Sequence, residues 1–161
     1  MSQWRKMAAE GVSQGDRFWF SRAFSAGELA AFGELTRDYN PVHYDEAFAK
    51  IKGFAGPICH GLLAGSMICE IGGQLGWLAT GMDFAFKKPI HPGDVITCEL
   101  TVEDVDAGHF ARAHARLTNQ DGVEVLAVSL EGYLPEAAAR DRLSQMMADG
   151  DPTNPLRDRR S

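Results

Sequence analysis

The chain has 161 residues and a hydrophobic content of 45%, which is the size and composition of a single globular domain with a sizeable core. Its formal net charge is −6 at pH 7, and this acidic balance excludes the strongly basic surface with which proteins bind nucleic acid. A phosphorylated ligand would therefore need a local cluster of basic side chains.

The cysteines and the apolar segments indicate the cellular setting. Cys59, Cys69 and Cys98 are odd in number and lack C-x-x-C spacing, which argues against a disulfide framework and against a zinc site. Free thiols are typical of the reducing cytoplasm, where we expect this protein. The N-terminus shows no apolar run long enough for a signal peptide. The apolar segment 62–71 is too short to span a membrane, so no membrane association is expected.

The first part of the chain predicts a short strand and then a helix. Residues 16–20 form an aromatic-rich strand candidate. Ser25 opens the helix, because Glu28 stands three residues later and completes a capping box. Apolar residues follow at helical spacing as far as Leu35, so this helix is expected to end near Asp38.

The middle of the chain predicts further helices. Residues 45–50 indicate a short helical turn, and residues 51–59 read as a loop because they are rich in glycine and proline. Segment 62–71 is almost wholly apolar, which predicts a helix buried on all sides. Its expected end is Gly72–Gly73, a natural helix stop. Residues 74–82 then form a short connection to the next strand.

From Asp83 onward, apolar residues recur at every second position. Residues 95–102, 109–117 and 123–134 alternate in this way, and short turn sequences separate them. Strands joined so closely pair antiparallel. A long antiparallel sheet curled around the buried helix is the economical way to bury both, so we predict an α+β fold of this kind.

The composition changes after Pro135. We expect residues 1–135 to form one domain and residues 136–161 to be a C-terminal extension. Residues 136–148 predict a short surface helix, whereas residues 149–161 are rich in Asp, Arg, Pro and Gly, which predicts a disordered tail. A single sheet of this kind has an exposed edge, and a homodimer would cover it.

Two chemically useful side chains flank a proline in the motif Asp-x-Asn-Pro-x-His, residues 38–43. Pro41 fixes its own φ and disfavours helix at the residue before it, so the chain turns after Asp38 and presents His43 from another direction. Asp38 alone would more often cap a helix end, and His43 alone would more often be structural. Together they predict a general acid and base that converge on one small molecule. Asn40 is expected to hold the turn.

A second motif, His60-Gly61, opens the apolar helix. A glycine at a helix N-terminus lets a ligand approach the bare backbone N–H, and the helix dipole there favours negative charge. The alternative for Gly61 is a glycine that only allows tight packing. His60 is expected to pack or to hydrogen-bond beside the site.

These residues carry a family resemblance. Asp-x-Asn-Pro-x-His, followed by Pro-Ile-x-His-Gly and an apolar helix, resembles the MaoC-like, (R)-specific enoyl-CoA hydratases, which are hotdog-fold enzymes. The resemblance extends over residues 24–134 and includes Phe-Lys-Lys-Pro-Ile-His-Pro-Gly-Asp at 86–94. It implies the hotdog fold, a single MaoC-like domain over residues 1–135, and a hydro-lyase that adds water to trans-2-enoyl thioesters or removes it.

The resemblance also implies roles for individual residues. Asp38 and His43 share one water molecule, and His43 is expected to accept its proton during syn addition. The Gly61 N–H binds the thioester oxygen as enolate charge builds. Lys87 and Lys88 are candidates for contacts with CoA phosphates, the alternative being a solvated strand end. No metal or redox cofactor is needed, since CoA belongs to the substrate. The acyl group, and the choice between CoA and acyl carrier protein, stay open.

The sequence departs from the family pattern at two places. In the family, a hydroxyl residue in the apolar helix often supports the catalytic carboxylate. By its spacing from the glycine, Cys69 takes that place here, with Ser66 as a substitute. A thiol is a weaker donor, and the alternative for Cys69 is a small buried hydrophobe. The family also usually has a longer loop where residues 74–82 stand, so its acyl preference is not carried over.

Two rival functions use the same fold. A hotdog acyl-CoA thioesterase also works with a carboxylate and a helix N-terminal amide, but it does not need the Asp-x-Asn-Pro-x-His pairing. A non-catalytic acyl-CoA-binding subunit, which would stabilise an active partner, is expected to lack that pair. The intact pair therefore favours the hydratase.

Overall fold

The computed structural model describes residues 3–157, whose five strands form one antiparallel sheet. The strands are β1 (Arg17–Ala23), β2 (Leu78–Phe86), β3 (Val95–Val105), β4 (Phe110–Thr118) and β5 (Glu124–Tyr133). They lie in the order β1-β3-β4-β5-β2, so β4 is the central strand and β1 and β2 are the edges.

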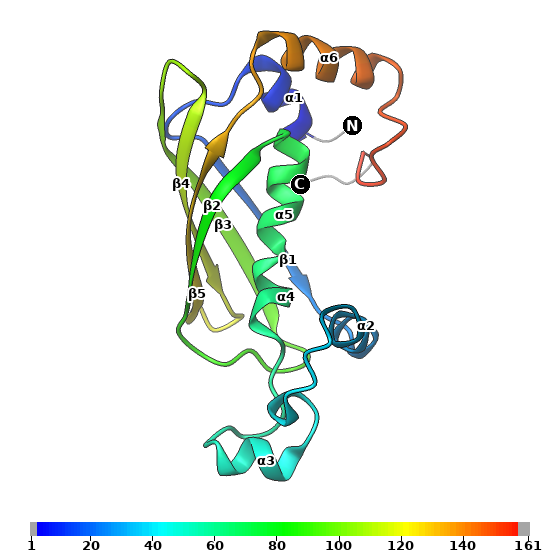
Figure 1. Ribbon diagram of the computed structural model, residues 1–161, viewed down its shortest axis with the longest axis vertical. Helices are drawn as coiled ribbons and strands as arrows, with labels where there is room; N and C mark the ends of the chain where they lie inside the picture. Colours follow the sequence, from blue (N-terminus) through cyan, green and yellow to red (C-terminus); the bar gives the residue numbers. More distant parts are fainter. Residues whose placement is uncertain (1–2, 158–161) are drawn as a thin grey trace.

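The helices cover one face and both ends of this sheet. They are α1 (Gln3–Glu10), α2 (Ala26–Thr36), the 3₁₀ turn η1 (Pro41–His43), α3 (Glu46–Ile51), α4 (Gly61–Gly65), α5 (Met67–Leu75) and α6 (Ala137–Ala148). Figure 1 shows α4 and α5 following each other along one face, α1 and α6 together at one end, and α2 and α3 at the other. Within residues 3–157, no helix is long and apolar enough to cross a lipid bilayer.

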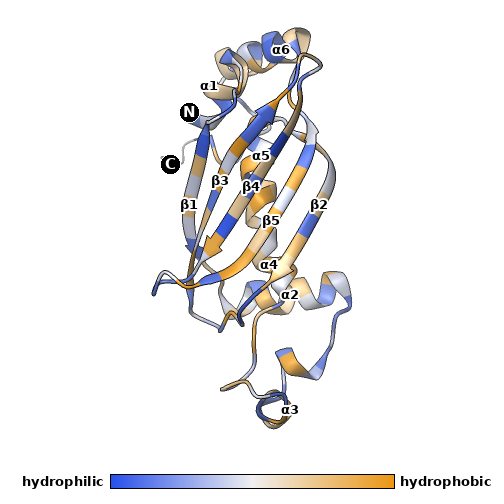
Figure 2. Ribbon diagram, turned by 90° about the vertical axis from the view of Figure 1, so that its left-hand side faces the viewer, coloured by the Kyte–Doolittle hydropathy of each residue, from blue (hydrophilic) through white to orange (hydrophobic). Residues whose placement is uncertain are grey.

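The alternation of side chains accounts for the sheet. In β3 and β4 every second residue is buried, so each strand turns one face toward the helices. Leu100 of β3 lies opposite Ala115 of β4 in the antiparallel register. Three of the buried positions of the central strand are alanines, which leave room for α5 to approach the sheet. Figure 2 shows the hydrophobic residues of α4 and α5 gathered behind the sheet.

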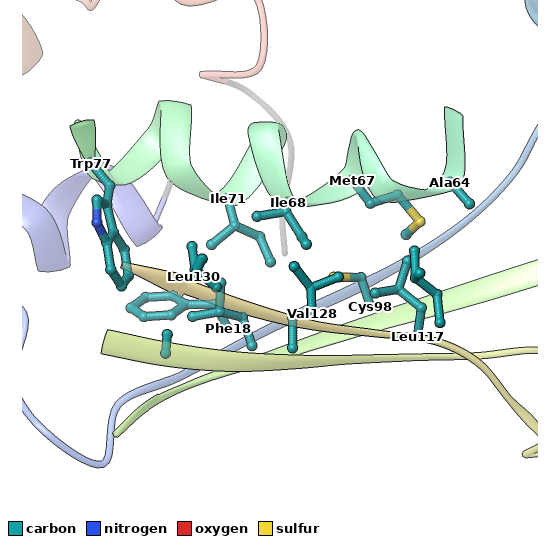
Figure 3. Close-up of a cluster of buried hydrophobic side chains, with 14 of the residues drawn as sticks. Phe18, Ala64, Met67, Ile68, Ile71, Trp77, Cys98, Leu117, Val128 and Leu130 are labelled. Atoms are coloured by element: carbon teal, nitrogen blue, oxygen red, sulfur yellow. The ribbon is translucent and has the colours of Figure 1, made fainter. Parts of the chain in front are cut away.

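The core lies between α4–α5 and the sheet. Ala64, Met67, Ile68 and Ile71 point from the helices toward the strands and are at most 1% exposed. Burial of each large aliphatic side chain contributes roughly 1.5–3 kcal/mol, so the helix pair is firmly held. Figure 3 shows the sheet residues that face them: Phe18, Cys98, Leu117, Val128 and Leu130. The N-terminus of α4 therefore rests on a rigid support.

The apolar helix differs from its prediction in two respects. It continues through Gly72 and Gly73 to Leu75, where Gly76 ends it with φ 65°. The expected stop is wrong because Leu75 is fully buried, and its burial outweighs the roughly 1 kcal/mol by which each helical glycine is unfavourable. The helix is also not buried on all sides, since Cys69 is exposed on the face turned away from the sheet.

One strand begins earlier than predicted, and one helix is absent from the prediction. The strand expected from Asp83 is β2, which begins at Leu78 and pairs with β5, so residues 78–82 of the expected connection 74–82 are strand. The helix α1 was not predicted, because only two of its eight residues, Trp4 and Ala8, are buried. The other expected elements of the first half, β1, α2 and α3, are present, and Ser25 and Glu28 form the predicted capping box.

The C-terminal extension begins as predicted, with α6 over Ala137–Ala148. The prediction of a disordered tail is wrong for residues 149–157, which pack against α1 and α5. Asn154 is 3% exposed and exchanges two amide hydrogen bonds with Gln74, of 3.0 and 2.9 Å. Asp151 is 1% exposed and lies 3.7 Å from Arg5. The polar composition of this segment predicted disorder, but the side chains of Asn154 and Asp151 are paired inside the protein. The last four residues of the predicted tail, 158–161, lie outside the described range.

Candidate active site

The loop after α2 carries the two predicted catalytic side chains. Arg37 ends α2 in the left-handed conformation (φ 59°), which turns the chain toward Asp38. The Asn40 side chain accepts a hydrogen bond from the Val42 N–H at 3.2 Å and caps η1, of which Pro41 is the first residue. Asp38 Oδ1 accepts from the Asn40 N–H at 3.2 Å. These local bonds fix the direction in which His43 leaves the loop.

Asp38 and His43 meet across this loop. His43 Nε2 lies 3.7 Å from Asp38 Oδ2, with the histidine side chain 10% exposed and the carboxylate 49% exposed. His43 Nδ1 is 2.8 Å from the Ile58 carbonyl oxygen, which can only accept, so Nδ1 carries a proton. In neutral His43 the lone pair is therefore on Nε2, the nitrogen that faces Asp38. The imidazole is set to accept a proton at this position.

His60 takes part in the site more closely than the sequence indicated. It is buried, its ring stacks on that of His43 with centroids 3.9 Å apart, and its Nε2 lies 3.0 Å from the Asp38 carbonyl oxygen. Asp38, His43 and His60 bring one potential metal-ligand atom each within 4.8 Å of one another. Each imidazole already uses one nitrogen on a main-chain carbonyl, which leaves each a single nitrogen for any ion.

Gly61 is the first residue of α4, directly after the cap residue His60. The first N–H groups of a helix have no partner within it, so this N–H is available to a ligand. The ring of Phe86 lies against the glycine: a Cβ atom added to Gly61 would be 2.4 Å from Phe86 Cε1. A larger residue at this position would therefore displace the Phe86 ring, whatever the Gly61 N–H binds.

Two pockets meet at Gly61 and Phe86. One, of about 310 Å³, contains His43, and the other, of about 380 Å³, contains Asp38. Gly61 and Phe86 are the residues common to both linings. The first pocket is also lined by Ile58, Cys59 and Lys88, and the second by Phe32, Thr36 and Leu62. A ligand that occupies both pockets lies against Gly61 and the Phe86 ring.

Among the hydrogen bonds within residues 3–157, none joins Ser66 or Cys69 to Asp38. The Ser66 hydroxyl donates to the Leu63 carbonyl at 2.6 Å, because Ser66 stands at the junction of α4 and α5. Cys69 is exposed rather than buried. The hydrogen bonds of Asp38 join it to its own loop and to Thr36, Tyr44 and His60.

The two lysines differ in their surroundings. Lys87 forms an ion pair with Glu124, and its hydrogen bond, followed by that of Arg116, lowers the pKa of the Glu124 carboxyl. Both lysines line the pocket that contains His43.

Burial raises the pKa of the Cys59 thiol in the same pocket to about 11, with Asp94 adding to the effect, so this thiol is protonated at neutral pH.

Comparison with known proteins gives consistent results. The family model of the MaoC like domain matches residues 12–123. The (R)-specific enoyl-CoA hydratase of Aeromonas caviae is 38% identical over 100 residues, which are 60% of this chain and 75% of that protein. The 3-hydroxybutyryl-CoA dehydratase of Methylorubrum extorquens is 27% identical over 137 residues, or 80% and 85% of the two chains.

The fold is also that of a solved relative. The structure of the (R)-hydratase from A. caviae involved in PHA biosynthesis superposes with a TM-score of 0.72 at 33% identity. The match covers 78% of this chain and 99% of that one. It confirms the predicted α+β hotdog fold, in which the sheet wraps around α4 and α5.

Proposed function

This chain belongs to the MaoC-like domain family and is a hydro-lyase of the hydratase/dehydratase class, and from that premise we propose that it acts on enoyl thioesters with (R) specificity. It would add water to trans-2-enoyl-CoA or remove it from the (R)-3-hydroxyacyl-CoA. One observation carries the proposal: the free Nε2 of His43 faces the Asp38 carboxyl at 3.7 Å, beside the first N–H of α4.

The proposed reaction is a syn addition in which the two side chains divide the proton transfers. His43 Nε2 takes a proton from water while the water oxygen bonds to C3. Asp38, in its carboxylic-acid form, gives a proton to C2. The proton on His43 then passes to the Asp38 carboxylate across the 3.7 Å gap, which restores both groups. Each such acid or base role is typically worth ~10²–10⁴ in rate.

Gly61 serves the thioester carbonyl in this scheme. As a proton is added at C2, the reaction passes through enolate-like charge on the carbonyl oxygen, and an N–H aimed at that oxygen stabilises it. Removing one donor of this kind costs an enzyme ~10²–10³ in rate. The two pockets share Gly61 and Phe86 and are otherwise lined by different residues, so one would hold the acyl group and the other the pantetheine arm. Metals and redox cofactors have no step in this reaction.

Lys88 is the better candidate for a CoA phosphate. Both lysines line the pocket that contains His43, but Lys87 already shares its charge with Glu124. Phosphate would compete with that ion pair, whereas contact with Lys88 need not break it. An acyl carrier protein, which presents the same pantetheine arm, would be recognised by the same pocket.

We propose a homodimer in the cytoplasm as the working form. β2 is an edge strand, and apolar side chains on it are exposed: Leu78 by 69%, Met82 by 40% and Phe86 by 56%. An open edge with apolar side chains is normally covered by another chain. Light scattering at micromolar concentration would test the dimer; a monomer would contradict it.

Hydration of a panel of trans-2-enoyl-CoAs, followed by loss of the conjugated-thioester absorbance, tests the function. Asp38→Asn and His43→Gln should each leave a folded protein and lower kcat by at least ~10². His114→Gln, on the central strand, is the matched control and should keep wild-type activity. Near-wild-type hydration by both site variants would contradict the mechanism. Release of free thiol from saturated acyl-CoA would instead support the thioesterase.

A further inference from the structure

Two side chains that take no part in the proposed proton transfers lie within hydrogen-bonding distance of the main-chain carbonyl oxygen of Asp38. The Tyr44 hydroxyl lies 3.3 Å from the Asp38 carbonyl oxygen, and His60 Nε2 lies 3.0 Å from the same atom. A carbonyl oxygen only accepts hydrogen bonds, so the hydroxyl and the imidazole N–H both donate to it. Together they fill both acceptor positions of this carbonyl.

The surroundings of His60 leave this contact as its hydrogen bond to the loop. His60 is 2% exposed, and within residues 3–157 its Nδ1 has no hydrogen-bond partner. With Nε2–H directed at the Asp38 carbonyl, the ring also forms the surface on which His43 stacks, at 3.9 Å and 29°.

Gly33 leaves the space that Tyr44 occupies. A Cβ atom added to Gly33 would lie 1.9 Å from the Tyr44 hydroxyl oxygen, far inside any non-bonded contact. Gly33 stands within α2, where glycine is less favourable than alanine by about 1 kcal/mol, so its presence there has a packing reason. Tyr44 is 48% exposed, and therefore the hydroxyl position, rather than burial of the ring, gives that reason.

From these contacts we infer that Tyr44 is a positioning residue for Asp38, acting with His60 on the Asp38 carbonyl in the space that Gly33 leaves. The Asp38 side chain is 49% exposed and follows the left-handed residue Arg37, so its loop depends on such anchors to keep the carboxylate near His43. A displacement of about 1 Å in a reacting group can reduce a rate ~10²-fold. The inference rests on the proposed function, because its kinetic effect requires Asp38 to act in hydration.

Tyr44→Phe is the first test, since it removes only the hydroxyl. Loss of one hydrogen bond of ordinary strength predicts a roughly fivefold fall in kcat for crotonyl-CoA. KM should stay within about twofold, because Tyr44 lines neither of the two pockets. An unchanged kcat overturns the inference. A raised KM with unchanged kcat also overturns it, because Tyr44 would then serve binding of the substrate.

Gly33→Ala gives a second test with a control in the same helix. We expect it to lower kcat at least as much as Tyr44→Phe does, because its methyl group displaces the hydroxyl. Gly27→Ala should keep wild-type kcat, since among the described residues an added Cβ there meets only Ser25 Oγ, at 3.9 Å. In the Tyr44→Phe background, Gly33→Ala should cause little further loss, because the clashing oxygen is gone and a small shift of the half-exposed ring relieves the remaining 3.2 Å contact with Cζ. Additive losses in the double variant would contradict the assigned contact.

The third test examines His60 and separates this inference from the proposed function. His60→Gln keeps a side-chain N–H and should retain more kcat than His60→Leu, which has none; equal losses would count against the donor role. ¹H–¹⁵N correlation spectra of the histidine rings should show His60 as the Nε2–H tautomer, and Tyr44→Phe should shift its signals. If the wild-type chain hydrates no enoyl thioester while these spectra agree, the proposed function fails and the contact stands. The Nδ1–H tautomer for His60 would overturn the contact itself.

Discussion

Replacing Gly61 by alanine would place a methyl carbon 2.4 Å from Cε1 of Phe86 and 2.6 Å from Cδ1. Carbon atoms in contact lie about 3.5–4.0 Å apart, so the ring has to retreat by at least about 1 Å. Phe86 is 56% exposed and can move, which puts the loss of stability at the low end of the ~1–3 kcal/mol typical of overpacking. The ring lines both pockets, so any retreat changes the path that a substrate follows.

We therefore expect Gly61→Ala to impair activity much more than stability. A shift of about 1 Å at the reacting centre predicts a fall in kcat/KM of roughly 10–10²-fold. A loss of about 1 kcal/mol in the free energy of unfolding predicts a Tm only about 2–4 °C lower. Initial rates with crotonyl-CoA and a thermal melt of the same samples measure both. Gly72→Ala is the control, because an added Cβ there has no neighbour within 4 Å among the described residues.

A second variant shows whether the ring or the backbone is responsible. Gly61→Ala keeps the N–H that is proposed to bind the thioester oxygen, so the variant should be nearly neutral when Phe86→Ala has already removed the ring. The comparison is between the double variant and Phe86→Ala alone. If Gly61→Ala is as active as the wild type, the packing argument is refuted. If it is equally damaging without the ring, the loss arises at the backbone and the reasoning from Phe86 is wrong.

Further predictions concern the C-terminal segment and the cysteines. Deleting residues 149–161 should lower Tm by several degrees, because each buried amide left unpaired costs about 1–3 kcal/mol. Asn154→Ala should have part of this effect, and Thr153→Ala, at an exposed position, should have none. An unchanged Tm after the deletion would mean that the tail does not dock. At pH 8, iodoacetamide should label Cys69 and spare Cys59. The pKa of about 11 keeps the Cys59 thiol protonated until the pH approaches that value. Rapid labelling of Cys59 in the native protein would contradict its burial. Cys69→Ser and Cys69→Leu should be equally active in a chain where this side chain does not support the carboxylate, and a loss confined to Cys69→Leu would restore that role.

The acid–base loop is predictable from sequence because its contacts are local. Pro41 and the Asn40 cap act within a few residues, and they turn the chain between Asp38 and His43. The capping box at Ser25 and the alternation of the strands are local or periodic in the same sense. Such signals set the hotdog architecture and bring the predicted pair together.

The remaining features depend on contacts between distant parts of the chain. The approach of His60 to the Asp38 carbonyl joins residues 22 apart, and the pairing of Gln74 with Asn154 joins residues 80 apart. The motif marks His60 as a residue beside the site but does not identify its partner, and nothing in the polar C-terminal segment marks Asn154. Gly33 is a partial exception. Glycine is unfavourable within a well-capped helix, so its presence there indicates that another side chain occupies the space beside it.

The stereochemistry of hydration tests the central claim most directly. Asp38 and His43 belong to one short loop, so both act at one face of the alkene, while the Gly61 N–H fixes the carbonyl and with it the face of C3 that is presented. Wild-type protein is incubated with crotonyl-CoA, and the product is divided between two NAD-dependent dehydrogenases, one specific for (S)-3-hydroxyacyl-CoA and one for the (R) isomer. NADH should form only with the (R)-specific enzyme. Formation of NADH with the (S)-specific enzyme would contradict the assigned geometry, even if Asp38 and His43 both proved essential.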